Sequence, residues 1–418
     1  MFEENGNNLP LDGNALVGQS GGPTAAINAT LSGVIKGLRN CHNVKRIYGA
    51  KNGIEGVCAG KIVDLALAVQ TAEDHYALEC TPAAALGSCR KKLPNDLNDP
   101  VYAEIFEVFR RYGIRFFIYI GGNDSMDTAE KLSRYAQKNF YEIYVVGVPK
   151  TIDNDIMITD HTPGYPSALK YIATTVEEIA RDCSIYTVKA VTIVEIMGRD
   201  AGWLAAGAAL PRIFGQASAD LVYVAEAIFD FDRFIEDVNG ILAEKPNVVV
   251  AVSEGIKTAD GKYVGESAQS GSVDIFGHKY LAGAAKVLET YVRAKIGCKC
   301  RSIELSLPQR CAGHCLSKTD IEESVLVGAS CAEHVAAGFS GDFAYLERDD
   351  SPDGEYSVSV GFCPVSKVAN HIKTIPVSYI VPRGCNVTDS LLTYLAPLIE
   401  GEVAIPMQNG LPKHFTID

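Results

Sequence analysis

The sequence predicts an α/β protein with mainly parallel sheets. Short apolar runs of strand length recur along the chain, and segments with apolar residues at helical spacing follow them. The clearest runs are residues 116–120, 143–146, 190–194 and 247–252. In parallel α/β sheets, ligands gather beyond the carboxyl ends of the strands, so the loops after these runs are the first places to look for function.

The first loop follows the run 116–120 and reads Gly121, Gly122, Asn123, Asp124, Ser125. Apolar residues at helical spacing come directly after it, which predicts a strand, a glycine turn and a helix. Adjacent glycines let a ligand approach the backbone, and the amides at a helix start favour an anion such as phosphate. The alternative is an ordinary tight turn that happens to use glycine.

The second loop, residues 149–155, follows the run 143–146 and carries Lys150, Thr151, Asp153 and Asp155. A lysine can hold phosphate as a point charge, and an aspartate can accept the proton of an attacking hydroxyl. This composition suits phosphoryl transfer. The alternative is a turn whose Asx side chains bond only their own backbone.

Together with four further loops, these two loops stand in the order in which the phosphofructokinase family has them. The chain therefore resembles this family and, within it, the pyrophosphate-dependent branch. The four further loops are residues 18–28, with Gly21 and Gly22, residues 86–90, residues 194–202 and residues 252–255. Arg301 and Arg310 stand where the family places arginines on the sugar 6-phosphate. The resemblance spans most of the chain.

The resemblance implies two similar Rossmann-like three-layer domains, with the active site in the cleft between them. Residues 1–165 plus about 309–365 would form the phosphoryl-donor domain. Residues 166–308 plus about 366–418 would form the sugar-phosphate domain. The implied reaction moves a phosphoryl group from pyrophosphate to the 1-hydroxyl of fructose 6-phosphate. It gives fructose 1,6-bisphosphate and orthophosphate, is reversible and belongs to glycolysis.

Residue roles follow from the same resemblance. Asp153 is the expected general base, Lys150 and Arg90 neutralise the moving charge, and Thr151 donates a hydrogen bond to the phosphoryl group. The expected phosphate-donor residues are Gly21, Gly22, Gly122, Asn123, Asp124, Ser125 and Lys150. The expected substrate-binding residues are Thr151, Asp153, Asp155, Met197, Gly198, Arg199, Glu254, Arg301 and Arg310.

Magnesium is the implied cofactor, with Asn123 and Asp153 as its candidate ligands. ATP-using members of the family commonly have an aspartate where this chain has Asn123, and an amide is a weaker ligand for a hard cation. The family's usual histidine and one of its arginines are also replaced, by Leu307 and Ala190, and Lys189 is the candidate to substitute for the charge of the arginine.

The phosphoryl donor is predicted from two charged residues, because ATP-using members normally have glycine at both positions. Asp124 would repel the inner phosphate of a nucleotide, and Lys150 would add a cation beside pyrophosphate. An ATP-dependent enzyme of the same fold remains the main alternative. A catalytically silent regulatory subunit is another, although Asp153, Lys150 and Arg199 are all present. A dinucleotide-binding oxidoreductase is a further alternative. It is disfavoured because this chain has no acidic residue in a convincing ribose-binding setting after the early glycine loop.

Composition fits a cytoplasmic enzyme that binds neither nucleic acid nor membranes. The 418 residues carry 51 acidic and 38 basic side chains, a net charge of -13. The sequence has no apolar stretch of about 18 residues and no signal-peptide pattern at its start. The 12 cysteines favour free thiols. One group is weighed as a zinc site and disfavoured for its spacing: Cys298, Cys300, Cys311, His314 and Cys315. Arginines shared between subunits in the family imply a homodimer or homotetramer.

Overall fold

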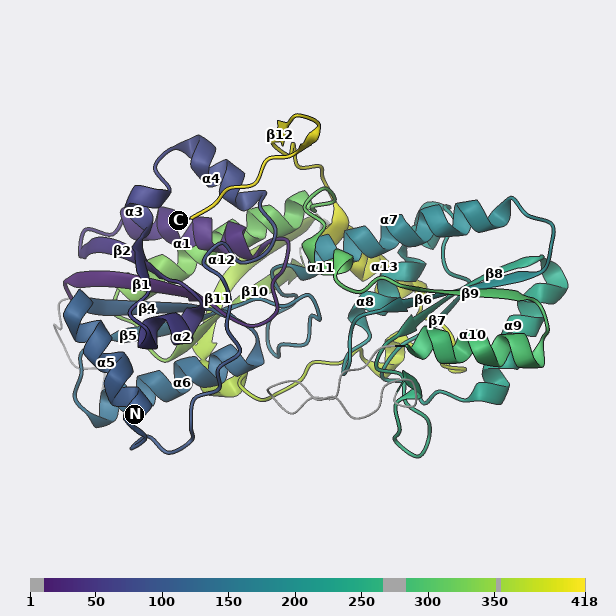
Figure 1. Ribbon diagram of the computed structural model, residues 1–418, viewed down its shortest axis with the longest axis horizontal. Helices are drawn as coiled ribbons and strands as arrows, with labels where there is room; N and C mark the ends of the chain where they lie inside the picture. The colour runs from purple at the N-terminus through teal and green to yellow at the C-terminus, as the bar shows by residue number, and fades with distance from the viewer. Residues whose placement is uncertain (1–10, 266–282, 351–354, 418) are drawn as a thin grey trace.

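The computed structural model describes residues 11–265, 283–350 and 355–417. Two sheets, each flanked by helices, form two lobes that lie side by side (Figure 1). The predicted α/β class with mainly parallel sheets is confirmed. No helix in the described part of the chain is both long and apolar enough to cross a membrane.

The first lobe is built on a sheet of seven strands. In spatial order they are β11 (Tyr356–Pro364), β10 (Asp342–Asp350), β5 (Tyr144–Pro149), β4 (Ile114–Gly121), β1 (Gly13–Gln19), β2 (Val44–Ala50) and β3 (Ile62–Asp64). The strands from β10 to β2 pair in parallel, and the edge strands β11 and β3 run antiparallel. The carboxyl ends of β1, β4 and β5 therefore lie at one edge of the sheet, where the predicted phosphate loops begin.

Helices cover both faces of this sheet because its central strands alternate apolar side chains between the two faces. On β1, Val17 belongs to the core cluster that includes residues of α1 (Ile27–Arg39) and α12 (Lys318–Ala336). Its neighbour Leu16 belongs to the opposite cluster. That cluster includes residues of α2 (Gly53–Cys58), α5 (Pro100–Tyr112) and α6 (Asn123–Lys138). The short helices α3 (Leu65–Ala68) and α4 (Ala72–Glu79) follow β3.

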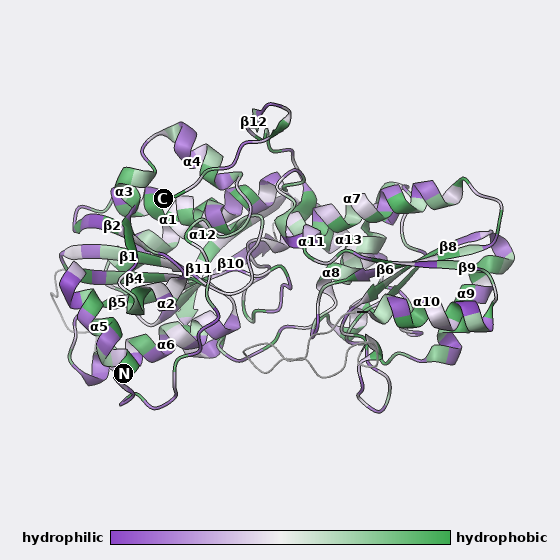
Figure 2. Cartoon of the chain, in the orientation of Figure 1, coloured by the Kyte–Doolittle hydropathy of each residue, from purple (hydrophilic) through white to green (hydrophobic). Residues whose placement is uncertain are grey.

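The second lobe is built on four parallel strands in the described residues. In spatial order they are β7 (Leu221–Tyr223), β8 (Asn247–Ser253), β6 (Ala190–Ile196) and β9 (Lys299–Glu304). On one face the core includes residues of α7 (Tyr165–Ser184), α8 (Trp203–Ala206), η1 (Gly207–Phe214), α13 (Asp389–Leu395) and η5 (Ala396–Ile399). On the other it includes residues of α9 (Phe231–Glu244) and α10 (Ala284–Lys295). Figure 2 shows α7, α10 and α12 banded in green and purple, as expected for helices with one apolar face.

The chain crosses between the lobes more than once. It passes from β5 to α7, returns through α11 (Pro308–Cys311) and α12, and leaves again after β11 through η3 (Val365–Lys367) and η4 (Val377–Tyr379) (Figure 1). After a small hairpin of β12 (Met407–Gln408) and β13 (Leu411–Pro412), Phe415 and Ile417 pack on the core of the first lobe. The last residues thus lie apart from the second domain to which the sequence assigned them. The other domain boundaries stay a prediction.

Candidate active site

A cleft with a volume of about 480 Å³ lies between the two lobes, where the carboxyl ends of strands from both sheets meet. Most of the residues singled out from the sequence line it. They are Gly21, Gly22, Arg90, Gly122, Asn123, Asp124, Ser125, Lys150, Thr151, Asp153, Asp155, Met197, Arg199, Glu254 and Arg310. The loops after β1, β4 and β5 supply one wall, and the loops after β6 and β8 supply part of the opposite wall.

The loop after β1 brings its backbone close to the side chain of Lys150. Gly21 has φ +79°, a left-handed conformation that favours glycine, and a Cβ atom there would lie 3.1 Å from Lys150 Nζ. Its amide donates to the Cys89 carbonyl at 3.1 Å, and Ser88 Oγ donates to its carbonyl. The segment that carries Arg90 is thereby bonded to the first glycine loop.

The loop after β4 places the start of α6 at the cleft. Gly122 is the N-cap residue, and the backbone amides at the start of a helix are the kind of group that binds an anion. The Oδ1 atom of Asn123 is buried and has no hydrogen-bond partner. Asp124 is partly exposed and pairs with Lys92, whose Nζ lies 3.4 Å from Oδ1 of the aspartate. This turn therefore offers amides for an anion, an unused amide oxygen and a paired carboxylate.

Lys150 follows β5 directly and is buried, with only 2% of its surface exposed. Its Nζ donates to the Gly22 carbonyl at 2.6 Å, and its amide donates to the Gly121 carbonyl at 3.0 Å. Burial lowers the pKa of this lysine to about 8, against the opposing charges of Asp153 and Asp155. Lys150 thus joins three loops and supplies the donor side with a desolvated cation.

The acid loop, which we define as residues 151–161, carries two carboxylates into the cleft. Burial raises the pKa of Asp153, and burial together with the charge of Asp153 raises the pKa of Asp155 to about 7. The Asp153 amide donates to Thr151 Oγ1 at 3.2 Å, and Thr151 Oγ1 in turn lies 3.4 Å from Asp153 Oδ2. A cationic ligand between these acids would favour their charged forms.

The sugar-side wall is formed by the loops after β6 and β8. The Gly198 amide donates to Glu254 Oε1 at 3.4 Å, and Ser253 Oγ donates to the Gly198 carbonyl. Gly198 lies between Met197 and Arg199, which line the cleft, but it does not itself line the cleft as the sequence predicted. Burial, and then the charge of Asp153, raises the pKa of Glu254 to about 8. The Arg199 Nε atom is buried and has no hydrogen-bond partner.

The two arginines expected on the sugar phosphate lie at different places in the structure. Arg310 lines the cleft, and a Cβ atom on Gly22 would lie 3.7 Å from its Nη1 atom. Arg301 is exposed on β9 and lines a different cavity of about 200 Å³, together with Cys183 and Thr192. The expectation that Arg301 joins the other substrate residues therefore does not hold within one chain, because β9 directs it to the outer surface.

Several cleft residues escaped the sequence analysis. Lys91 and Lys92 directly follow Arg90, so the run of three cations was a readable signal. Asn370 and Ile372 come from the segment between the lobes, and nothing local in the sequence marks them. Among the described residues, no group of three or more His, Cys, Asp or Glu side chains is placed to hold a metal ion. A metal in the cleft would therefore need ligands from its substrate.

Comparisons with known proteins agree with this geometry. The family model described as phosphofructokinase matches residues 14–310. A pyrophosphate–fructose 6-phosphate 1-phosphotransferase of Xanthomonas campestris is 39% identical over 97% of this chain and 96% of its own. One from Methylococcus capsulatus is 37% identical over 97% of this chain and 96% of its own. A crystal structure of the pyrophosphate-dependent phosphofructokinase of Nitrosospira multiformis superposes with a TM-score of 0.87. It is 35% identical and covers 96% of both chains.

Proposed function

Because this chain belongs to the phosphofructokinase family, we propose that it is a pyrophosphate-dependent phosphotransferase acting on fructose 6-phosphate. It moves a phosphoryl group to the 1-hydroxyl, giving fructose 1,6-bisphosphate and orthophosphate, and the reaction is reversible. The observation that carries this proposal is the buried Lys150 cation beside two glycine loops, with the Asp153 carboxylate in the same cleft. A cation for phosphate and a base for the hydroxyl are the two groups that phosphoryl transfer needs.

In this mechanism Asp153 accepts the proton of the sugar 1-hydroxyl. Its raised pKa makes it a better base than an ordinary aspartate, and a loose transition state asks for little deprotonation before attack. Thr151 donates a hydrogen bond to the phosphoryl group, and Lys150 and Arg90 neutralise the charge that moves to orthophosphate. Arg199 and Glu254 orient the sugar phosphate from the opposite wall, and Arg310 contacts it from its position beside Gly22.

Pyrophosphate is the proposed donor because of the charges where a nucleotide would extend. The Asp124 carboxylate lines the donor end of the cleft and is paired with Lys92. The α-phosphate of a nucleotide would meet this carboxylate and would have to displace its partner, whereas pyrophosphate ends before it. The reactive end of pyrophosphate would lie against the glycine amides and Lys150.

Magnesium is the proposed cofactor, and the residues present fit it. The unpartnered Asn123 Oδ1 and the Asp153 and Asp155 carboxylates are oxygen ligands of the kind that a hard cation prefers. Magnesium usually binds through one or two carboxylates and the phosphates of its substrate, so a site with few protein ligands suffices. When bound, it would neutralise the charge of the phosphate oxygens.

The proposal includes a homo-oligomer of two or four chains in the cytoplasm. Support for shared sites comes from Arg301, which is exposed on the second lobe away from its own cleft, as expected of an arginine that serves a second copy. The sugar wall of a single chain also leaves Arg199 Nε without a partner. A phosphate held by a ligand from each chain explains both observations.

The decisive experiment gives purified protein fructose 6-phosphate, magnesium and one phosphoryl donor at a time. The proposal expects release of orthophosphate with pyrophosphate and no turnover with ATP. Turnover with ATP alone contradicts the donor assignment and leaves the phosphofructokinase chemistry intact. No turnover with either donor favours the silent regulatory subunit.

A further inference from the structure

A lysine outside the predicted site is bonded to the acid loop in four places. Lys373 lies in the segment that runs between the lobes, and its ammonium donates to Asn154 Oδ1 at 3.1 Å, to the Thr159 carbonyl at 3.0 Å and to the Asp160 carbonyl at 2.8 Å. Its backbone amide donates to the Asp155 carbonyl at 2.8 Å. An ammonium has three N–H donors, so all three are used on this loop.

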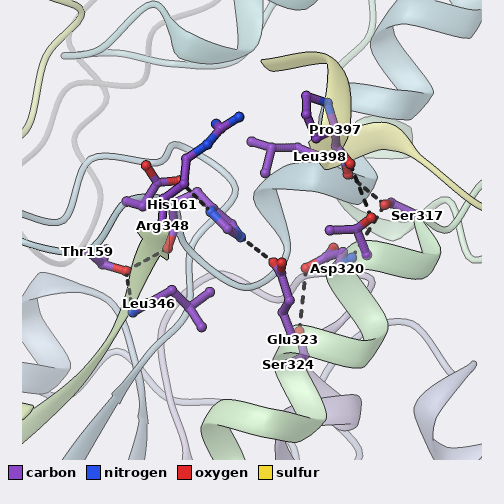
Figure 3. Close-up of polar contacts among 12 residues, drawn as sticks. Thr159, His161, Ser317, Asp320, Glu323, Ser324, Leu346, Arg348, Pro397 and Leu398 are labelled. Atoms are coloured by element: carbon purple, nitrogen blue, oxygen red, sulfur yellow. Dashed lines mark hydrogen bonds and ion pairs between the residues drawn. The ribbon is translucent and has the colours of Figure 1, made fainter. Parts of the chain in front are cut away.

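The far end of the acid loop is fixed to the first lobe by a buried polar network. Thr159 Oγ1 accepts the Leu346 amide of β10 at 3.0 Å, and the Asp160 amide donates to the Leu346 carbonyl at 2.8 Å. Figure 3 shows His161 directed toward Glu323 of α12, and the Nε2–Oε2 distance is 2.6 Å. The Thr159 and Asp160 carbonyls, which accept hydrogen bonds from Lys373, therefore belong to a segment that is anchored to the first lobe.

The same lysine is also bonded to the sugar-side lobe. The Trp203 indole N–H, at the start of α8, donates to the Lys373 carbonyl at 3.2 Å, and the lysine Nζ lies 5.3 Å from the centroid of the indole ring. Two residues farther on, the Ile375 amide donates to Glu226 Oε1 at 2.8 Å, and Glu226 also accepts the Gly202 amide at 3.0 Å. Lys373 thus connects the acid loop to both lobes.

The tip of the acid loop needs such a support. Asn154 has φ +53°, a left-handed conformation that costs free energy in a residue other than glycine. It lies between Asp153 and Asp155, and burial, followed by the charge of Asp153, raises the pKa of Asp155. The bond from the Lys373 ammonium to the Asn154 side chain holds the residue between the two acids, so it sets where both carboxylates point.

We propose that Lys373 is a positioning residue for phosphoryl transfer, which holds Asp153 and Asp155 in register with the substrates by clamping the acid loop between the two lobes. This inference rests on the proposed function. Lys373 touches no reacting atom in this account. Its loss should therefore slow the chemical step more than it weakens either substrate.

The test compares Lys373→Met with the wild type and with Lys367→Met, a matched change at an exposed lysine six residues earlier. Lys373→Met should lower kcat about 10- to 100-fold, because a misplaced reacting group costs that much, and should change both KM values less than about threefold. Lys367→Met should leave both unchanged. Equal kcat values for Lys373→Met and wild type would overturn the inference, as would a loss confined to KM.

Two further readouts do not depend on activity. Amide hydrogen exchange in residues 153–161 should be at least about tenfold faster in Lys373→Met, because exchange reports local opening. Trp203 is the only tryptophan in the chain, so loss of the cation over its ring should also shift the emission. Unchanged exchange and emission contradict the clamp.

A second variant covers the case in which Lys373→Met does not fold. Asn154→Gly keeps the left-handed backbone accessible and removes only the side-chain acceptor of the lysine. It should also lower kcat and speed exchange in the loop, and unchanged values for both contradict the proposal. An inactive wild type with pyrophosphate would refute the proposed function instead, while the exchange experiment would still decide whether Lys373 holds the loop.

Discussion

The two walls of the cleft differ in how far one folded chain completes them. On the donor wall, Lys150 bonds to the Gly22 and Gly121 carbonyls, and the Gly21 amide bonds to the Cys89 carbonyl. On the sugar wall, Arg199 Nε has no partner, and Arg301 lies outside the cleft. Folding thus bonds the cation of the donor wall and leaves the Asn123 Oδ1 oxygen there without a partner, whereas the sugar wall keeps an unused cationic group, Arg199 Nε, for a ligand.

This difference indicates that the two walls contribute differently to catalysis and to substrate binding. A pre-assembled donor wall stabilises the moving charge without reorganising, which is the main source of rate enhancement in such reactions. A sugar wall with unused groups gains its bonds only when the substrate arrives. We therefore expect donor-wall changes to act mainly on kcat or on the donor, and sugar-wall changes to act mainly on KM for the sugar.

The largest expected effect comes from the base on the donor wall. Asp153→Asn keeps the size of the side chain and removes its ability to accept a proton, so kcat should fall about 10³-fold, a much larger change than any in KM for pyrophosphate. Steady-state rates with pyrophosphate check this. A variant that keeps its kcat would show that Asp153 is not the base and that the donor wall works through charge alone.

The next effect concerns the network that anchors the donor-wall acid loop. Hydrogen bonds and charge from Asp160 and Glu323 outweigh the burial of His161 and raise its pKa to about 9, compared with 6.5 ordinarily. A raised pKa stabilises the folded protein fully below pH 6.5, by about 3 kcal/mol, and this contribution disappears as the pH rises through about 9.

Urea unfolding of His161→Gln at several pH values measures this contribution. The variant should unfold more easily than wild type at pH 6, and the gap between the two should close toward pH 9. His42→Gln, at an exposed histidine, is the matched control and should show no such gap. A gap for His161→Gln that stays constant with pH would contradict a charged histidine in the network.

A smaller effect tests whether the sugar wall is shared between copies. Arg301→Gln should raise KM for fructose 6-phosphate about 10- to 30-fold and leave KM for pyrophosphate unchanged, the cost of one charge-assisted hydrogen bond. Mixing this variant with Asp153→Asn under conditions that exchange subunits should restore activity, because a mixed pair contains one complete site. A mixture no more active than its parts would place Arg301 outside the site altogether.

The smallest effect compares two glycines of similar conformation. Gly21→Ala places a Cβ atom 3.1 Å from Lys150 Nζ, whereas a Cβ atom on Gly60, with φ +65°, meets nothing within 4 Å. Both changes should cost about 1 kcal/mol of stability through the left-handed backbone. Only Gly21→Ala should also raise KM for pyrophosphate, by about fivefold, a modest cost for crowding one cation. Equal KM values for the two variants would separate Gly21 from the donor site.

Much of the donor wall could be predicted from the sequence because its residues follow strands directly. The runs 116–120 and 143–146 correspond to β4 and β5, and Gly122 and Lys150 stand immediately after those strands. Such positions depend on local pattern and on the general geometry of parallel sheets. The same holds for Glu254, which follows β8.

The rest of the site could not be predicted because it depends on contacts distant in the sequence. Lys373 bonds to Asn154 across 219 positions, and no periodicity or motif surrounds it. The antiparallel hairpin of β10 and β11 was likewise not predicted. Its residue Leu346 is hydrogen-bonded to the acid loop and anchors that loop to the first lobe. The position of Arg301 in the family motif could be recognised from the sequence. The direction of its side chain could not, because a strand residue can face either side of a sheet.

In the proposed enzyme, Asp124 and Lys150 together fit the cleft to pyrophosphate and exclude a nucleotide. The most direct measurement is kcat/KM for pyrophosphate and for ATP in the wild type and in Asp124→Gly. We expect activity only with pyrophosphate in the wild type and a gain of at least about tenfold with ATP in the variant, since removal of one close charge is worth that much. Efficient use of ATP by the wild type, or no gain in the variant, would contradict the claim.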